Sequence, residues 1–161
     1  MVDIEDFLSP DRLLLAFPAS SKRQLFEDLA ALASAATKIE PAVILAAIEQ
    51  RERLGTTGIG EGIAIPHARV PGLPKLIGYF ARLAAPVDYD ALDDAPVDLV
   101  FLLLAPEAES TAQLKALARI ARLLRDAPAG TRIVPPGLLW QAAQAPSPEE
   151  VLRGWLNNGP P

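Results

Sequence analysis

The sequence predicts a single α/β domain, built from a mixed β-sheet that is flanked by helices on its faces. Short apolar runs with the length of strands alternate with longer segments in which apolar residues recur at helical spacing. The chain has 161 residues, of which 50% are hydrophobic and 22% are charged, a globular composition that suffices for one sizeable core. We find no repeat and no linker that would divide it, so we expect layers packed around one sheet.

The chain begins with an expected strand and a helix. Residues 12–17 form a short apolar run with the character of a strand. Ser21 and Gln24 have the spacing of a capping box, in which the two side chains satisfy amide groups of the first helical turn. The apolar stripe expected for this helix consists of Leu25, Leu29, Leu32, Ala33 and Ala36.

A second helix is expected to begin at Pro41, because a first helical position does not need the N–H that proline lacks. Gly55 is a natural end for this helix. Its expected apolar residues are Val43, Ala47 and Ile48.

Extended segments and further helices are expected in the second half. Residues 63–67 form a short extended run, and residues 76–83 and 97–104 have the character of strands. The last of these is almost entirely apolar, so we expect it at the centre of the sheet, and the connection 86–96 is acidic. A capping box at Ser110–Gln113 opens a helix with an expected apolar face of Leu114, Leu117, Ala118, Ala121 and Leu124. Two more helices are expected, one over 135–144 and one opened by Ser147.

Composition excludes several classes of function. The net charge of -5 argues against a general nucleic-acid binder, which needs a basic face. The absence of cysteine excludes disulfides, thiolate zinc sites and cysteine nucleophiles. The start of the chain is acidic rather than basic, and no apolar run reaches the roughly 18 residues of a membrane span. We therefore expect a cytoplasmic protein without membrane insertion. A single histidine, His67, leaves one residue for any imidazole chemistry.

The segment before His67 is rich in glycine. Gly58, Gly60 and Gly62 lack the Cβ that would keep an anion away from backbone N–H groups. Pro66 fixes its own φ angle and favours an extended residue before it, so the chain entering His67 is stiff. A neutral imidazole is a competent nucleophile near neutral pH. These residues together are compatible with an anion site that contains a nucleophilic histidine.

Each of these features also has a structural interpretation. A single histidine beside a proline is more often structural than catalytic, and a glycine cluster is usually a turn. The glycine spacing fits neither the phosphate loop of nucleoside triphosphatases nor the dinucleotide fingerprint. Arg51, near the end of its helix, would interact favourably with the helix dipole in any case. Residue chemistry alone leaves both interpretations open.

The run Thr-Gly-Ile-Gly-Glu-Gly-Ile-Ala-Ile-Pro-His at 57–67 resembles the phosphorylation-site signature of phosphotransferase-system enzyme IIA domains of the fructose/mannitol class. Arg51-Glu52, the segment 93–101 and the helix after Pro106 fall where that family has counterparts. The resemblance covers nearly the whole chain. It implies an enzyme IIA type-2 domain over 5–157, with the fold of that class, and a C-terminal tail at 158–161.

The resemblance implies a phosphocarrier with a phosphohistidine intermediate. A phosphorylated histidine on the small carrier HPr, or on its nitrogen-branch paralogue, would transfer its phosphoryl group to Nε2 of His67. Arg51 would lie beside that group and help to neutralise it. The segment containing Gly58, Gly60, Gly62 and Pro66 would shape the rim of the pocket. No metal or organic cofactor is implied.

The sequence departs from the family pattern in two places. Family members commonly carry a second histidine where this chain has Gln113, which can donate a neutral hydrogen bond to a phosphate oxygen but cannot become cationic. Gln113 could instead serve only the capping box with Ser110, and both interpretations stay open. Arg69 lies close to His67 in the sequence and could supply part of the missing positive charge.

The form of the signature is closest to the nitrogen-regulatory branch, and no transporter, enzyme IIB or HPr-like segment accompanies the domain. We therefore expect a regulatory phosphocarrier whose targets are proteins such as sensor kinases or transporters. One alternative is a binding module with impaired phosphorylation, suggested by Gln113. The other is a sugar-uptake enzyme IIA with a separate IIB partner.

Overall fold

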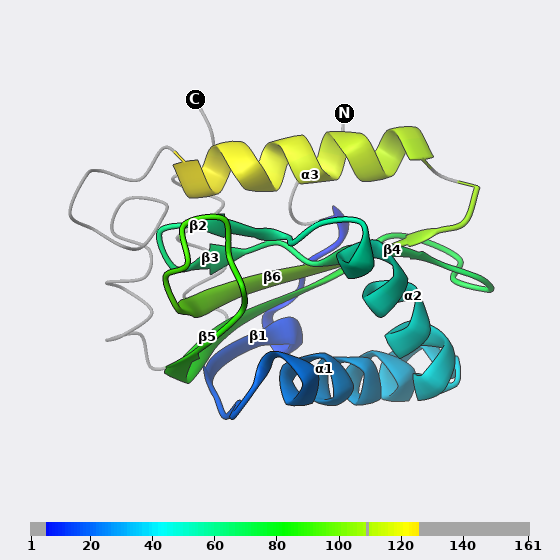
Figure 1. The fold of residues 1–161 in the computed structure, drawn as a ribbon. Coiled ribbons are helices and arrows are strands. Elements are labelled where there is room, and N and C mark those ends of the chain that lie inside the picture. The colour runs from blue at the N-terminus through cyan, green and yellow to red at the C-terminus, as the bar shows by residue number, and fades with distance from the viewer. Residues whose placement is uncertain (1–5, 109, 126–161) are drawn as a thin grey trace.

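The computed structural model describes residues 6–108 and 110–125, which form a six-stranded sheet between two helical layers. Helix α3 covers one face of the sheet, and helices α1 and α2 cover the other (Figure 1). After a short 3-10 turn, the elements are β1 (Leu13–Phe17), α1 (Lys22–Thr37), α2 (Pro41–Arg53), β2 (Gly58–Gly60), β3 (Ile63–Ala64), β4 (His67–Val70), β5 (Ile77–Val87), β6 (Val97–Pro106) and α3 (Ser110–Arg125). The predicted fold, a mixed sheet flanked by helices, is confirmed.

Strand β6 is the central strand of the sheet. It pairs antiparallel with β5 on one side and parallel with β3 and β4 on the other. The sheet is completed by β1, parallel to β5, and by β2, antiparallel to β3. The residues of β6 are buried with the exception of half-buried Asp98, as expected for a strand covered on both faces.

Strands β3 and β4 are one strand with an interruption. Ile63 pairs with Leu99, and His67 pairs with Leu103 four residues further along both strands, so the register is the same on either side. The interruption falls at Pro66, which has no N–H for the ladder. Its carbonyl still accepts a hydrogen bond from the Leu103 amide at 3.0 Å. The backbone at His67 is therefore attached to the central strand.

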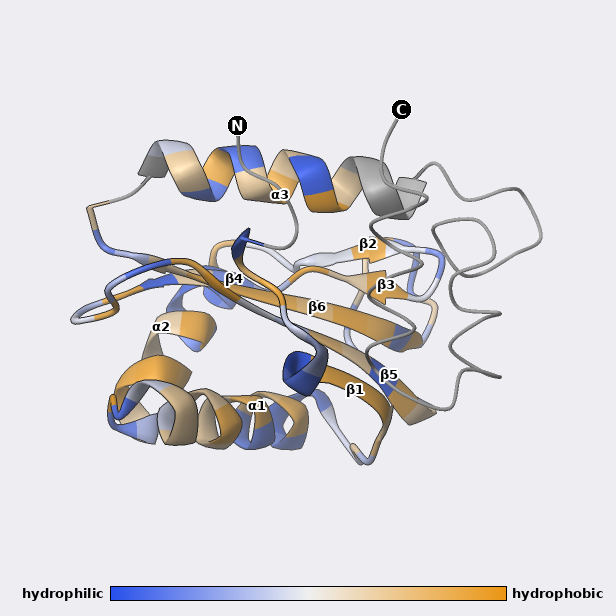
Figure 2. Cartoon of the chain, turned by 180° about the vertical axis from the view of Figure 1, so that it is seen from behind, coloured by the Kyte–Doolittle hydropathy of each residue, from blue (hydrophilic) through white to orange (hydrophobic). Residues whose placement is uncertain are grey.

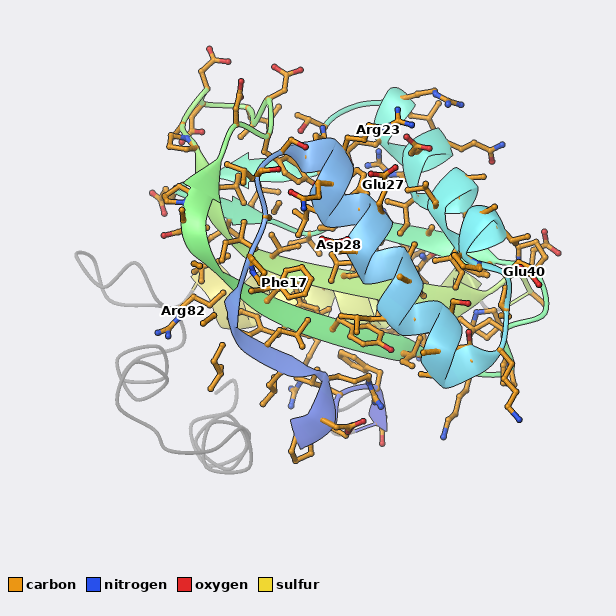
Figure 3. The ribbon with its side chains drawn as sticks, turned by 90° about the horizontal axis from the view of Figure 1, so that it is seen from below. Phe17, Arg23, Glu27, Asp28, Glu40 and Arg82 are labelled. Atoms are coloured by element: carbon orange, nitrogen blue, oxygen red, sulfur yellow. The ribbon has the colours of Figure 1, made fainter. Side chains whose placement is uncertain are left out.

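Each face of the sheet has its own core. On the α3 face, the rings of Phe7, Phe80 and Phe101 make edge-on contacts beneath Ala116 and Ile120. Figure 2 shows the alternation of apolar and polar residues along α3 that produces its buried stripe. On the opposite face, α1 lies across the strands with α2 beside it (Figure 3). The core there includes Leu25, Leu29, Ile44, Ile48, Val100 and Leu102.

The predicted helical faces were partly wrong. In α1 the buried residues are Leu25, Phe26, Leu29, Ala30 and Ala33, whereas Leu32 is 38% exposed and Ala36 is also exposed. In α2, Ile44 and Ile48 are buried and Val43 is exposed. In α3, Gln113, Ala116 and Ile120 are buried, Leu117 and Ala121 are half-buried, and Leu114 and Ala118 are exposed. Helical spacing identifies a broad apolar stripe, but the rotation of the helix on the sheet decides which edge of the stripe is covered.

Several predicted boundaries also differ from the structure. Strand β5 extends to Val87, into the segment expected to be a connection, and the glycine segment expected as a loop contains strand β2. At α1, Ser21 Oγ accepts from the Gln24 amide at 3.0 Å, but Gln24 Oε1 accepts from the Ser20 amide at 2.7 Å, one residue earlier than a capping box requires. Helix α3 begins at Ser110 itself. The helices expected over 135–144 and from Ser147, residue 5, and the domain boundary at 157 lie outside the described residues.

Candidate functional site around His67

Both ring nitrogens of His67 have partners that fix its tautomer. Nδ1 lies 2.9 Å from the carbonyl oxygen of Ile65, which can only accept a hydrogen bond. Nε2 lies 3.2 Å from Nε of Arg51, which can only donate one. Nδ1 therefore carries the proton, and Nε2 presents its lone pair. Both contacts favour the same neutral tautomer.

Arg51 reaches His67 from the last turn of α2. Its Nε donates to His67, while Nη1 donates to the carbonyl of Gly55 at 2.9 Å. A cation in this position interacts favourably with the carbonyl end of the helix. The guanidinium has further N–H donors besides these two, and they can bind the oxygens of an anion.

The surroundings lower the pKa of His67 below its ordinary value of 6.5. The main cause is burial, which disfavours the charged imidazolium, and the positive charge of Arg51 acts in the same direction. The carbonyl of Ile65 and the carboxylate of Glu52 oppose these effects without cancelling them. The ring is therefore neutral and nucleophilic at neutral pH.

Behind Arg51, the Glu52 carboxylate is held by three hydrogen-bond donors. It accepts from the Thr57 amide at 2.8 Å and from the Thr57 hydroxyl at 2.7 Å, and Lys22 Nζ lies 2.9 Å from Oε2. Burial acts to raise the pKa of Glu52, but the bonds from Thr57 and Lys22 outweigh it and leave the pKa lowered. Glu52 is therefore an ionised anchor next to Arg51 in the chain.

Tyr89 completes this arrangement from the loop after β5. Its hydroxyl lies 2.8 Å from Thr57 Oγ1, and its ring lies 4.3 Å from Lys22 Nζ. Thr57 already uses its single hydroxyl proton on Glu52, so Tyr89 donates to Thr57. Burial, with a further contribution from the Glu52 charge, raises the pKa of Tyr89, which keeps the phenol protonated as a donor.

The predicted glycines pack against the loop that carries Tyr89. A Cβ on Gly58 would lie 2.8 Å from the Cβ of Ala91 and 2.9 Å from the Tyr89 ring, so no larger residue fits there without displacement. Gly60 has φ +106 and packs against the carboxylate of Asp93. Gly62 has φ +81 and lies in the turn before β3. Pro66 interrupts the strand just before His67, as described above.

Arg69 and Gln113 form a second pair of predicted site residues. Arg69 Nε donates to Gln113 Oε1 at 3.3 Å, which joins β4 to α3. Ala68 and Val70 are buried on the α1 and α2 face. Because side chains alternate along a strand, His67 and Arg69 point to the other side of β4. Gln113, although buried, therefore has a partner outside the first turn of its own helix.

The structure thus joins Arg51 directly to His67 and Arg69 to Gln113. Sequence reasoning did not assign a role to Lys22, Thr57 or Tyr89, and quoted Glu52 only beside Arg51. The one local signal was a threonine five residues after a glutamate in the last turn of a helix. Lys22 and Tyr89 are distant in sequence and carried no signal.

Among residues 6–108 and 110–125, no three His, Cys, Asp or Glu side chains group closely enough to hold a metal ion. No helix there has the length and apolar character required to cross a bilayer.

A neutral imidazole nitrogen beside a guanidinium is suited to group transfer onto histidine. Residues 6–134 match the family described as "Phosphoenolpyruvate-dependent sugar phosphotransferase system, EIIA 2", and the chain belongs to this family, a phosphotransfer component of that system. Within it, the chain is most like the nitrogen-regulatory branch, as the sequence predicted.

Relatives and solved structures agree with this assignment. The chain is 50% identical to a nitrogen regulatory protein of Bradyrhizobium diazoefficiens over 123 residues, 76% of this chain and 80% of the relative. It is 44% identical to the Pseudomonas aeruginosa nitrogen regulatory protein over 125 residues, 77% and 81% of the two chains. The crystal structure of nitrogen regulatory protein IIA-Ntr from Neisseria meningitidis superimposes with a TM-score of 0.78 at 32% identity, covering 92% of this chain and 95% of that one.

Proposed function

We propose that the protein is a regulatory phosphocarrier that accepts a phosphoryl group on Nε2 of His67. The observation that carries this proposal is the pair of contacts that leave the Nε2 lone pair unprotonated beside Arg51. A nucleophile held in one tautomer needs no proton transfer before it attacks.

The proposed step breaks one P–N bond and forms another. The Nε2 lone pair of His67 attacks phosphorus, and the electron pair of the donor's P–N bond returns to the donor imidazole. The Nδ1 proton of His67 stays in its hydrogen bond to Ile65, so the phosphorylated ring is stabilised by that carbonyl. The guanidinium of Arg51 turns from the ring nitrogen to the phosphoryl oxygens that replace it.

The donor we propose is phosphorylated HPr or its nitrogen-branch paralogue. The names of the relatives, nitrogen regulatory proteins at 50% and 44% identity, favour the regulatory branch. Phosphorylation would add a charge of about -1.5 to -2 at one surface pocket. A target protein that binds the neutral imidazole would meet repulsion and a desolvation cost after phosphorylation, which is the basis of a switch.

The test is a phosphotransfer assay with the general phosphotransferase enzyme, phosphoenolpyruvate, and either HPr or its paralogue. We expect labelling of the wild type and none of His67→Ala, with little change in melting temperature for the variant. Absence of labelling from both donors would refute the proposal, and a large fall in melting temperature would show that His67 is structural. Onward transfer to an enzyme IIB would point to sugar uptake instead.

Variants of Arg69 and Gln113 distinguish a phosphocarrier from a binding module with impaired phosphorylation. Gln113 holds Arg69 on the side of β4 to which His67 points, so we propose that Arg69 supplies the cation that a second histidine would give. We expect Arg69→Ala to lower the phosphorylation rate about tenfold, and Gln113→His to change it little. A sharp rise in rate for Gln113→His would favour the impaired module, with Gln113 as its deficiency.

A further inference from the structure

Two chains of hydrogen bonds connect Thr57 to the ring of His67. In the first chain, the Thr57 carbonyl accepts a hydrogen bond from the amide of Ile65 at 3.0 Å. The carbonyl of Ile65 in turn accepts from Nδ1 of His67 at 2.9 Å. The Thr57 backbone therefore holds Ile65, the residue whose carbonyl binds the protonated nitrogen of the imidazole.

The second chain of hydrogen bonds leads to Nε2 of His67. The amide and hydroxyl of Thr57 both donate to the carboxylate of Glu52, so the chain between them is closed into a tight loop. Arg51, the residue before this loop, donates through Nη1 to the carbonyl of Gly55 within it and through Nε to Nε2 of His67. The geometry of the loop thus sets the position of the guanidinium.

Thr57 is itself held from behind. It is 4% exposed, and the Tyr89 hydroxyl donates to it from a ring that is fully buried. That ring packs edge-on against Phe26 of α1, with centroids 5.8 Å apart. Lys22 closes the outer side through its ion pair with Glu52. The Thr57 hydroxyl is therefore bonded by Glu52 and Tyr89, and both of these partners are supported in turn by residues of α1.

We propose that Thr57 is a positioning residue that orients both ring nitrogens of His67, and that Tyr89 is the anchor that holds it in place. The expected effect on phosphorylation rests on the proposed function. The expected effect on the tautomer of unphosphorylated His67 does not. Thr57 touches neither the ring nor the transferred group. It acts through Ile65 on Nδ1 and through the loop of Arg51 on Nε2.

A purely structural role for Thr57 makes a different prediction. A buried hydroxyl that only satisfies the Glu52 carboxylate would affect folding stability when removed, and would leave the tautomer of His67 unchanged. A positioning role requires that the ring reorients when the hydroxyl is lost. The tautomer of His67 in the folded, unphosphorylated protein therefore distinguishes a positioning role of Thr57 from a purely structural one.

The experiment compares Thr57→Val, Thr57→Ser and Tyr89→Phe by ¹⁵N NMR of the unphosphorylated protein. His67 is the single histidine of the chain, so its ring signals need no further assignment. We expect Thr57→Val to populate the tautomer protonated at Nε2 and to lower the phosphorylation rate about ten- to a hundredfold. Tyr89→Phe should shift the tautomer in the same direction, with about a fivefold loss of rate. Thr57→Ser, which keeps the hydroxyl, should restore both.

Tyr79→Phe is the matched control. Tyr79 is also a buried tyrosine on the α1 face of the sheet, but its hydroxyl donates to the Leu32 carbonyl, away from His67. This variant should keep the wild-type tautomer and rate. The inference is overturned if folded Thr57→Val and Tyr89→Phe keep the wild-type tautomer, or if Thr57→Ser is as impaired as Thr57→Val.

The NMR measurement distinguishes this inference from the proposed function. If the phosphotransfer assay fails while the tautomer responds as expected, the positioning role stands and the phosphocarrier proposal falls. Should Thr57→Val not fold, Tyr89→Phe still gives the result, because it removes a single hydroxyl from a packed ring.

Discussion

Arg51 donates to the nitrogen that we propose as the phosphoryl acceptor. In the resting state its Nε covers the lone pair of His67, while Nη1 is held by Gly55. The guanidinium must therefore turn aside as the donor approaches, and its contact with Gly55 gives it a fixed pivot. In the proposed transfer, Arg51 thus has two roles: it covers the nucleophile at rest and neutralises the phosphoryl group afterwards.

Removal of the Arg51 side chain should affect both the phosphorylation rate and the pKa of His67. We expect Arg51→Ala to lower the phosphorylation rate about a hundredfold, as is typical when a single electrostatic donor is lost from a site. The pKa of His67 should rise because a nearby positive charge is gone, yet stay below 6.5 because burial remains the larger effect. NMR titration of the single imidazole measures the second quantity.

Arg53→Ala is the control for that variant, because Arg53 belongs to the same last turn of α2 and its side chain is exposed. It should leave both the rate and the pKa of His67 unchanged. Equal effects of the two substitutions would mean that only the net charge of the helix end matters.

Among the elements, strand β2 shows how a glycine allows a neighbouring loop to pack closely against it. Gly58 lies under Ala91 and the Tyr89 ring, and its carbonyl accepts from the amide of Leu92 at 3.0 Å. The glycine segment therefore carries the loop of Tyr89, and through Tyr89 it is connected to Thr57.

Crowding at this position can be measured. Gly58→Ala should lower the free energy of unfolding by about 1–3 kcal/mol, because the new methyl group would overlap Ala91 and Tyr89. Gly72→Ala is the matched comparison, since its φ of +84 is unfavourable for alanine but a Cβ there meets nothing within 4 Å. Urea unfolding of both variants should give the larger loss for Gly58→Ala, and a larger loss for Gly72→Ala would contradict close packing at β2.

How far the sequence predicts each element depends on the range of the forces that shape it. The start of α2 at Pro41 and the apolar run of β6 follow from local chemistry, and both were predicted. The exposure of Val43 and Leu114 depends on how each helix is rotated against the sheet, which local spacing does not contain.

The same distinction applies to the site. His67 and Arg51 were identified by the resemblance of a continuous motif, and the structure places them in contact. Tyr89 reaches Thr57 only because the loop after β5 runs beside β2, where the Leu92 amide donates to the Gly58 carbonyl. No sequence pattern predicts this contact, because the two residues are 32 positions apart and belong to segments without a shared motif.

For the whole molecule, stability against acid depends on groups whose pKa is lower in the folded protein than in the unfolded chain. His67, Glu52 and Asp93 all have a lowered pKa in the fold. Asp93 owes this to hydrogen bonds from the amides of Glu61 and Ala95. For each group the unfolded chain binds its proton at a higher pH, so acidification favours unfolding.

We expect the free energy of unfolding to change little above the ordinary histidine value of 6.5. It should fall as the pH drops from that value through the lowered pKa of His67. It should fall again below about 4.5, the ordinary glutamate value, because the unfolded chain then takes up protons that Glu52 and Asp93 resist in the fold. Urea unfolding over this pH range measures the effect. His67→Gln should remove the upper decline and keep the lower one, whereas a gain in stability between pH 7 and 5 would contradict the lowered pKa of His67.

The interrupted strand also bears on the order in which the molecule assembles. Residues 63–70 are synthesised before β6, yet they pair parallel with it, Ile63 with Leu99 and His67 with Leu103. Parallel partners so distant in the chain cannot nucleate as a hairpin, so the antiparallel pair β5 and β6 should form first. During refolding, the ability to accept phosphate would therefore return later than the bulk of the secondary structure, and each active molecule would be one whose sheet is already closed around β6.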